Sequence, residues 1–78
     1  MGADMTELVR TIATALAEKP EAVEVSSFAK GRTHYVRLKV DPEDMGRVIG
    51  RDGRVATAVR SLLTAAADGE RWRLEIVD

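Results

Sequence analysis

The most informative stretch of the chain is Gly46-Arg47-Val48-Ile49-Gly50-Arg51-Asp52-Gly53-Arg54. Gly50 and Gly53 lie three positions apart, after a short apolar segment and before a segment with helical spacing. Because glycine has no Cβ, a turn on these positions allows the backbone of another polymer to approach closely. The N–H groups at the start of the following helix favour an anion. The stretch therefore predicts either a phosphate-binding turn or, more simply, a tight connection between two helices.

Charge is unevenly distributed along the chain. The net charge is −1, which argues against a protein that binds polyanions over its whole surface. The segment from Lys30 to Arg60 has eight basic and four acidic residues, so it carries +4 while the remainder carries −5. This distribution indicates either charges scattered over a solvated surface or a local anion site in the middle of the chain.

Length and composition limit the class of protein. The 78 residues, 45% apolar and 32% charged, are typical of one small folded domain. The absence of cysteine excludes a disulfide scaffold and a zinc knuckle. No apolar run approaches the roughly 20 residues of a membrane-spanning helix. The first residues do not resemble a secretory signal, so we expect a cytoplasmic protein.

The spacing of apolar residues predicts three helices. The first covers residues 4–19, with Asp4 as its N-cap and Pro20 as its stop. A short second helix covers residues 41–49, because Asp-Pro is a favourable helix start. The third covers residues 54–66 and carries a wide apolar stripe.

Alternating polarity predicts three strands, over residues 22–28, 33–40 and 71–77, with Lys30-Gly31-Arg32 as a basic hairpin turn. The side chains predicted to face inward are Val36, Leu38, Val40, Trp72, Leu74 and Ile76. Those predicted to face outward are Tyr35, Arg37, Lys39, Arg71, Arg73 and Glu75. The order of the elements predicts a two-layer α+β domain, with a three-stranded sheet and three helices on one face (α-β-β-α-α-β).

No catalytic constellation is present. The chain has one histidine and no Ser/His/Asp set, and its glycine turn is not a Walker phosphate loop. We therefore expect a binding protein rather than an enzyme, with no cofactor and no metal. The three aromatic residues argue against a binding mode dominated by base stacking.

The run Val48-Ile49-Gly50-Arg51-Asp52-Gly53 resembles the V-I-G-x-x-G signature of KH domains. The expected order of elements resembles the type II arrangement of that fold. The length, the acidic lead-in before the signature and the arginine after Gly53 are similar to those of the small bacterial KH proteins called KhpA. The resemblance covers about residues 4–78 and implies a single KH domain over residues 1–78, with residues 1–4 loosely ordered.

The resemblance implies a groove for single-stranded RNA, in which the glycine turn clamps the backbone of about four nucleotides. The implied RNA-binding residues are Arg47, Val48, Ile49, Gly50, Arg51, Asp52, Gly53 and Arg54, together with Lys30, Arg32, Arg37 and Lys39. Asp52 departs from the pattern, because it places a carboxylate where a phosphate is expected. Three alternatives are open: Asp52 points away, pairs with Arg51 or Arg54, or weakens binding.

The family also implies partners and a cellular role. KhpA-like proteins are expected to form homodimers, to pair with a larger KhpB-like protein, and to act as RNA chaperones and post-transcriptional regulators that affect cell shape. The alternative function is a protein-interaction module whose nucleic-acid groove is weak or idle. For a dimer we predict contacts through Leu62 and Leu63, on the apolar stripe of residues 54–66.

Overall fold

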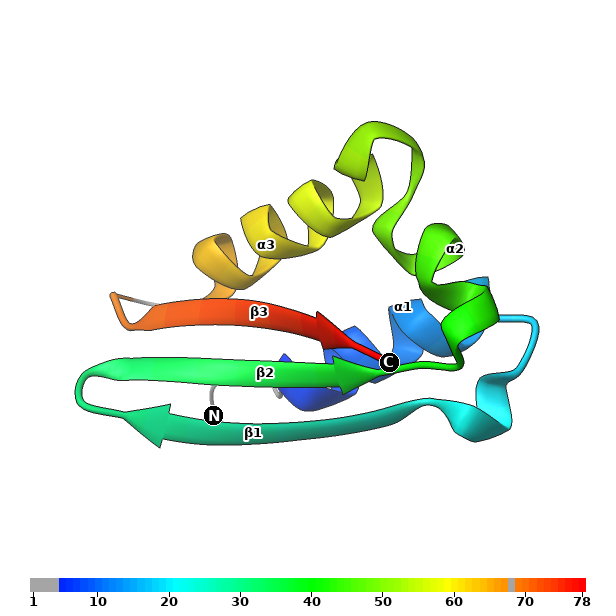
Figure 1. Cartoon of the computed structure of the whole chain (residues 1–78). Helices are drawn as coiled ribbons and strands as arrows, with labels where there is room; N and C mark the ends of the chain where they lie inside the picture. The colour runs from blue at the N-terminus through cyan, green and yellow to red at the C-terminus, as the bar shows by residue number, and fades with distance from the viewer. Residues whose placement is uncertain (1–4, 68) are drawn as a thin grey trace.

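The computed structural model describes residues 5–67 and 69–78, and it has two layers (Figure 1). Three helices, α1 (Met5–Leu16), α2 (Met45–Ile49) and α3 (Arg54–Ala66), pack on one face of a sheet. The sheet has the strands β1 (Glu24–Lys30), β2 (Thr33–Lys39) and β3 (Arg71–Val77). The predicted α+β class and order of elements are confirmed. The predicted cap at Asp4 and the loose order of residues 1–4 lie outside the described residues.

The first helix is shorter than the sequence predicts. It ends at Leu16 rather than near Lys19. The backbone N–H groups of Glu18 and Lys19 donate to the side chain of Asp44, 26 and 25 residues further on, instead of continuing the helical ladder. A tertiary hydrogen bond therefore sets this boundary, and no local pattern encodes it.

The sheet is mixed. Its order is β1-β2-β3, with β1 antiparallel to β2 and β3 parallel to β2. Gly31, at φ 62°, forms the tight turn between β1 and β2. The parallel pair requires a crossover, which α2 and α3 supply. The crossover places the turn between α2 and α3 at one end of the sheet, and the β1–β2 turn at the other end (Figure 1).

The core lies between the helices and the sheet. The most deeply buried apolar side chains are Val36, at 0% exposure, with Val9, Ala13 and Leu63 at 1%. The predicted inward residues Val36, Leu38, Val40 and Leu74 belong to this core, and Trp72 and Ile76 pack against it. Leu63 is therefore a core residue, which corrects its predicted place at a dimer interface. Its neighbour Leu62 is 47% exposed.

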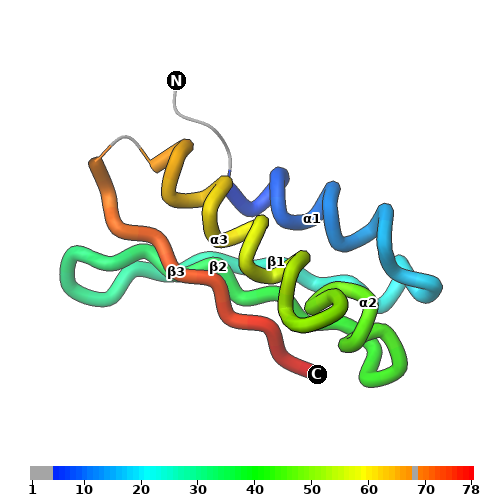
Figure 2. Tube along the Cα trace, turned by 90° about the horizontal axis from the view of Figure 1, so that it is seen from above, coloured from blue at the N-terminus to red at the C-terminus, as the bar shows by residue number. Residues whose placement is uncertain are grey.

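The other face of the sheet carries no helix, as the views in Figures 1 and 2 show. The side chains of Tyr35, Arg37 and Lys39 lie there, as the alternation along β2 predicts. We call this surface the open face. It also carries Phe28, whose ring stacks on Tyr35 with centroids 4.9 Å apart.

Candidate nucleic-acid interface

The turn between α2 and α3 consists of residues with unusual backbone angles. Gly50 (φ 81°), Asp52 (φ 56°) and Gly53 (φ 75°) all have positive φ. The N–H of Gly53 donates to the carbonyl of Gly50 at 3.1 Å and closes the turn. Arg51 and Asp52 at its tip are exposed. Glycine and aspartate tolerate positive φ better than most residues do. Three of the four residues of this turn adopt it, and the turn projects into solvent.

The two glycines of the turn have different physical roles. A Cβ on Gly50 would lie 2.5 Å from Cγ2 and 2.8 Å from the backbone N of Val55. A Cβ on Gly53 would meet nothing within 4 Å. Glycine is therefore required at position 50 by the chain's own helix α3, a role that was not predicted from the sequence. Only Gly53 faces open space.

The amino end of α3 follows directly on this open space. Gly53 is the N-cap; no side chain caps the helix, and the N–H of its first residue, Arg54, donates to the carbonyl of Arg51. No acidic residue lies in the first turn of α3. Because the first N–H groups of a helix have no intrahelical partner and carry partial positive charge, this end favours an anion.

Two of the three clustered arginines are available for an external anion. Arg51 and Arg54 are exposed, and within residues 5–67 and 69–78 no carboxylate lies within ion-pair distance of either. Asp52 is exposed and pairs with neither of them, so one of the three alternatives for Asp52 is removed. Arg47 differs, because its guanidinium lies 2.7 Å from Oε1 of Glu18.

A buried carboxylate supports the turn from below. Asp44, immediately before α2, is 1% exposed and accepts hydrogen bonds from the backbone N of Glu18 at 3.2 Å and of Lys19 at 3.0 Å. Oδ1 of Asp44 is also 3.6 Å from Nε of Arg47. These contacts fasten the end of α1 to the segment that carries the turn. Sequence reasoning missed Asp44, since an acidic residue in an acidic run gives no sign of burial.

A second group of ion pairs, which is exposed, also joins the end of α1 to the segment before α2. Nζ of Lys19 lies 2.6 Å from Glu43 and 3.7 Å from Asp41. The hydrogen bond to Glu43, followed by the charges of Asp41 and Glu43, raises the pKa of Lys19. Lys19 thus adds an exposed ion-pair contact between the end of α1 and the segment that precedes α2.

The apolar residues next to the turn divide between core and surface. Val48 is only 3% exposed and belongs to the core, which corrects its predicted role under bound bases. Ile49 and Val55 are partly buried, so they retain surface beside the turn. The apolar floor predicted from the sequence is therefore smaller than expected.

The remaining predicted RNA-binding residues do not gather at the turn. Lys30 and Arg32 flank the β1–β2 turn, which lies at the far end of the sheet from Gly50–Gly53 (Figure 1). Arg37 and Lys39 lie on the open face, where Arg37 pairs with Glu75 at 3.0 Å and Lys39 lies 3.9 Å from Glu24. The fold thus separates these four cations from the turn.

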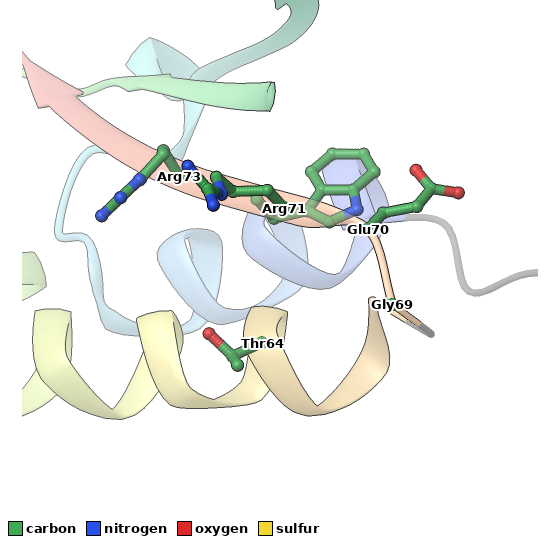
Figure 3. Close-up of a pocket in the computed structure, with 6 residues that line it drawn as sticks. Thr64, Gly69, Glu70, Arg71 and Arg73 are labelled. Atoms are coloured by element: carbon green, nitrogen blue, oxygen red, sulfur yellow. The ribbon is translucent and has the colours of Figure 1, made fainter. Parts of the chain in front are cut away.

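A pocket of about 330 Å³ lies between the last turns of α3 and the first residues of β3 (Figure 3). The residues that line it are Thr64, Gly69, Glu70, Arg71, Trp72 and Arg73. Figure 3 shows Arg71 and Arg73 along β3, with Thr64 opposite them on α3. The sequence predicted both arginines as outward-facing without assigning them to a site. The available signal was the Arg71-Trp72-Arg73 alternation next to a glycine.

Arg60 connects the turn to this pocket along α3. It is exposed and precedes Thr64 by four residues, so both lie on the same side of the helix. In the described part of the chain no carboxylate pairs with Arg60. Arg54 and Arg60 are the two basic residues of α3; they are about 9 Å apart along the axis and about 120° apart around it, and Arg60 lies on the side that leads to Thr64, which is about 15 Å from the start of the helix.

Two classes of site are not found among the residues that the structure describes. No helix there has the length and hydropathy needed to cross a membrane. No group of three or more His, Cys, Asp or Glu side chains is placed there to hold a metal ion.

Comparison with known proteins gives a consistent result. The family model described as "KhpA/KhpB, KH domain" matches residues 6–76. The chain is 51% identical over 70 residues to "RNA-binding protein KhpA" of Caldanaerobacter subterraneus subsp. tengcongensis, covering 90% of this chain and 93% of that protein. It is 46% identical over 76 residues to "RNA-binding protein KhpA" of Halalkalibacterium halodurans, covering 95% of this chain and 100% of the relative. No solved structure matches the chain.

Proposed function

The chain belongs to the KhpA/KhpB KH-domain family, a non-enzymatic binding fold, and from this membership we propose that it binds single-stranded RNA at the turn between α2 and α3. The observation that supports the proposal is that positive charge, a helix start and open space occur together at this turn. Arg51 and Arg54 have no carboxylate partner among the described residues, and they flank an uncapped helix start beside the open space at Gly53. A phosphate fits that combination of space, N–H groups and charge.

The proposed contact begins with the RNA backbone. A phosphate at Gly53 accepts from N–H groups of the first turn of α3 beyond Arg54, whose own N–H donates to the carbonyl of Arg51, while the side chains of Arg51 and Arg54 neutralise its charge. The following nucleotides run beside α3, past Arg60, toward the pocket at Thr64. The distance of about 15 Å suits a strand of a few nucleotides. Trp72, whose ring also stacks on His34, and Thr64 line that pocket; the Thr64 hydroxyl donates to the carbonyl of Arg60 and can accept a hydrogen bond from a base.

In the cell, the proposed role is that of an RNA chaperone or post-transcriptional regulator in the cytoplasm. The relatives named above as RNA-binding proteins support RNA as the ligand. The proposed partners are a second copy of the chain or a KhpB-like protein. Because one small module binds with modest affinity, a second groove on the same strand raises the effective affinity.

A second candidate function, a dimerisation module with a weak RNA groove, is supported by one exposed apolar side chain. Leu62 is 47% exposed on α3, and no other large apolar residue in the described part of the chain is more exposed. Sedimentation velocity at micromolar concentration separates the candidates, since a strict monomer that binds RNA leaves the dimerisation function without support.

The proposed clamp predicts that Arg51→Glu weakens binding of a four-nucleotide RNA about tenfold, which corresponds to about 1.4 kcal/mol. The reason is that an attraction to the phosphate becomes a repulsion of similar size. Fluorescence anisotropy with labelled oligouridylate measures this change. The slope of log Kd against log salt should also fall by about 0.7, because one phosphate contact is lost.

Arg10→Glu is the matched control. Arg10 is an exposed arginine on α1 that pairs with Glu7, so its reversal changes the net charge equally, away from the turn. We expect less than a twofold change in Kd. Equal affinity for Arg51→Glu and wild type, with equal thermal midpoints, would exclude the clamp.

Asp52→Asn is predicted to strengthen binding of the same RNA about fivefold. Asparagine tolerates the positive φ of residue 52 as aspartate does, so the change removes charge without strain. A carboxylate about 4 Å from a phosphate costs about 1 kcal/mol in water. The same anisotropy titration measures the effect, and an unchanged Kd would show that the Asp52 carboxylate lies away from the bound phosphate.

A further inference from the structure

The open face has a distinct arrangement of side chains at its hairpin end. The strand register aligns Phe28 with Tyr35 and Tyr35 with Arg73 in one row across the sheet. The next row toward the hairpin contains Lys30, Thr33 and Arg71. Because alternate residues of a strand share a face, both rows project from the side of the sheet without helices. We call these residues the aromatic–basic patch.

The aromatic residues of the patch are held in a fixed arrangement. The rings of Phe28 and Tyr35 stack at 4.9 Å with an interplanar angle of 11°. The guanidinium of Arg37 lies 5.0 Å from the centre of the Phe28 ring and donates two hydrogen bonds to Glu75, at 3.0 and 3.1 Å. Phe28 nevertheless remains 38% exposed. Two of the three aromatic residues of the chain, exposed Phe28 and half-buried Tyr35, thus form a stacked pair on the open face.

The charge of this end of the sheet is uncompensated. In the described part of the chain no carboxylate pairs with Lys30, Arg32, Arg71 or Arg73. At the other end of the same face, Lys39 is 3.9 Å from Glu24 and Arg37 is paired with Glu75. In a chain of net charge −1, four cations without partners around a stacked pair are a local excess.

We propose that the aromatic–basic patch is a second contact surface for single-stranded nucleic acid, an inference that rests on the proposed function in assuming that RNA is the ligand. Bases stack on the Phe28–Tyr35 pair, while the surrounding cations contact phosphates. This combination of aromatic platform and positive charge is that of surfaces that bind single strands without sequence preference. Aromatic residues and arginine are also enriched at protein interfaces. The four cations without a carboxylate partner among the described residues, rather than the two rings, are the feature that favours a polyanion here.

The patch is continuous with the pocket at the edge of the sheet. β3 is an edge strand, and Arg71 and Arg73 belong to the patch by register while also lining the pocket between α3 and β3 (Figure 3). The distance from β3 to β1 is two strand spacings, or about 10 Å. A strand that leaves the pocket can therefore cross β3 and reach Phe28. Four nucleotides at the turn do not span both surfaces, whereas about twelve do.

The test uses the full chain, oligouridylates of four and twelve nucleotides, and the double variant Phe28→Ala/Lys30→Glu. Both substituted residues lie on β1. Neither of them lines the pocket or belongs to the turn between α2 and α3. We expect Kd for the twelve-nucleotide RNA to rise at least fivefold and Kd for the four-nucleotide RNA to change less than twofold. Arg51→Glu should weaken both oligonucleotides, and Arg10→Glu neither. Thermal midpoints establish that each variant is folded.

Unchanged binding of the twelve-nucleotide RNA by folded Phe28→Ala/Lys30→Glu overturns the proposal. So does a loss of self-association in sedimentation with RNA binding intact, because the patch is then a protein-docking surface. A single variant on β1, Lys30→Glu, repeats the test if the double variant is unfolded. Failure of the clamp is detected separately, as an unchanged Kd of Arg51→Glu for the four-nucleotide RNA.

Discussion

A Gly50→Ala variant is expected to lose about 3–5 kcal/mol of folding free energy, whereas Gly53→Ala loses about 1 kcal/mol. In Gly50→Ala, the new Cβ meets both the side chain and the backbone N of Val55, at 2.5 and 2.8 Å. The backbone atom cannot move without α3. The φ of 81° with ψ of 168° is a further strain for any residue with a Cβ.

The loss is large compared with the stability of a chain of this length. For 78 residues the total unfolding free energy is about 4–12 kcal/mol. Gly50→Ala therefore removes between about a quarter and all of the unfolding free energy. Urea unfolding followed by circular dichroism and by the fluorescence of Trp72 measures both variants.

Gly53→Ala is the matched control, because it makes the same chemical change three residues away. It has positive φ as well, at 75°, but its Cβ would meet nothing within 4 Å. If the two variants lose equal stability, the contact of Gly50 with Val55 does not decide the packing of α2 against α3.

Asp44→Ala is expected to lower the unfolding free energy by about 2–4 kcal/mol. The change leaves the backbone N–H groups of Glu18 and Lys19 without their acceptor, and it removes the carboxylate near Arg47. Because Asp44 is 1% exposed, water cannot fully replace the lost oxygens. Urea unfolding measures the loss, and amide hydrogen exchange at Lys19 should accelerate locally.

Asp41→Ala serves as the control for Asp44→Ala. Asp41 lies three residues earlier and accepts from the backbone N of Glu43 at 2.9 Å, but it is partly exposed. Loss of such a cap costs about 1 kcal/mol. If Asp41→Ala were as destabilising as Asp44→Ala, burial of the Asp44 carboxylate would not be the source of its effect. Faster exchange at Lys19 in both variants would lead to the same conclusion.

Much of the fold was predictable because the relevant signals are local. Alternation along β2 and β3 placed Val36 and Leu74 inward and Arg37 outward, since a strand reverses its side chains at every residue. The glycine spacing identified the turn and the exposed arginines Arg51 and Arg54 beside it. The first strand was placed too early, at residues 22–28, because Pro20–Ala22 instead form a 3₁₀ turn before β1.

The errors share one cause, which is that contacts between distant segments leave no local pattern. Leu62 and Leu63 are adjacent leucines on one apolar stripe, yet one is 47% exposed and the other 1%. The amphipathic pattern shows which side of α3 is apolar. It does not show which residues at the two edges of that apolar side are covered by the sheet. Likewise, Lys30 and Arg32 are basic like Arg51, but the topology of the sheet puts them at the opposite end.

The amino-acid sequence by itself determined the order of the elements, the faces of the strands and the backbone freedom of the glycine turn. These depend on residue type and short-range spacing. Only the tertiary structure decided which partners the charges and glycines have. The parallel pairing of β2 with β3 and the burial of Asp44 bring together residues 25 to 38 positions apart. Through such contacts Arg47 is held by Glu18, and the cations of β1 and β3 meet on the open face.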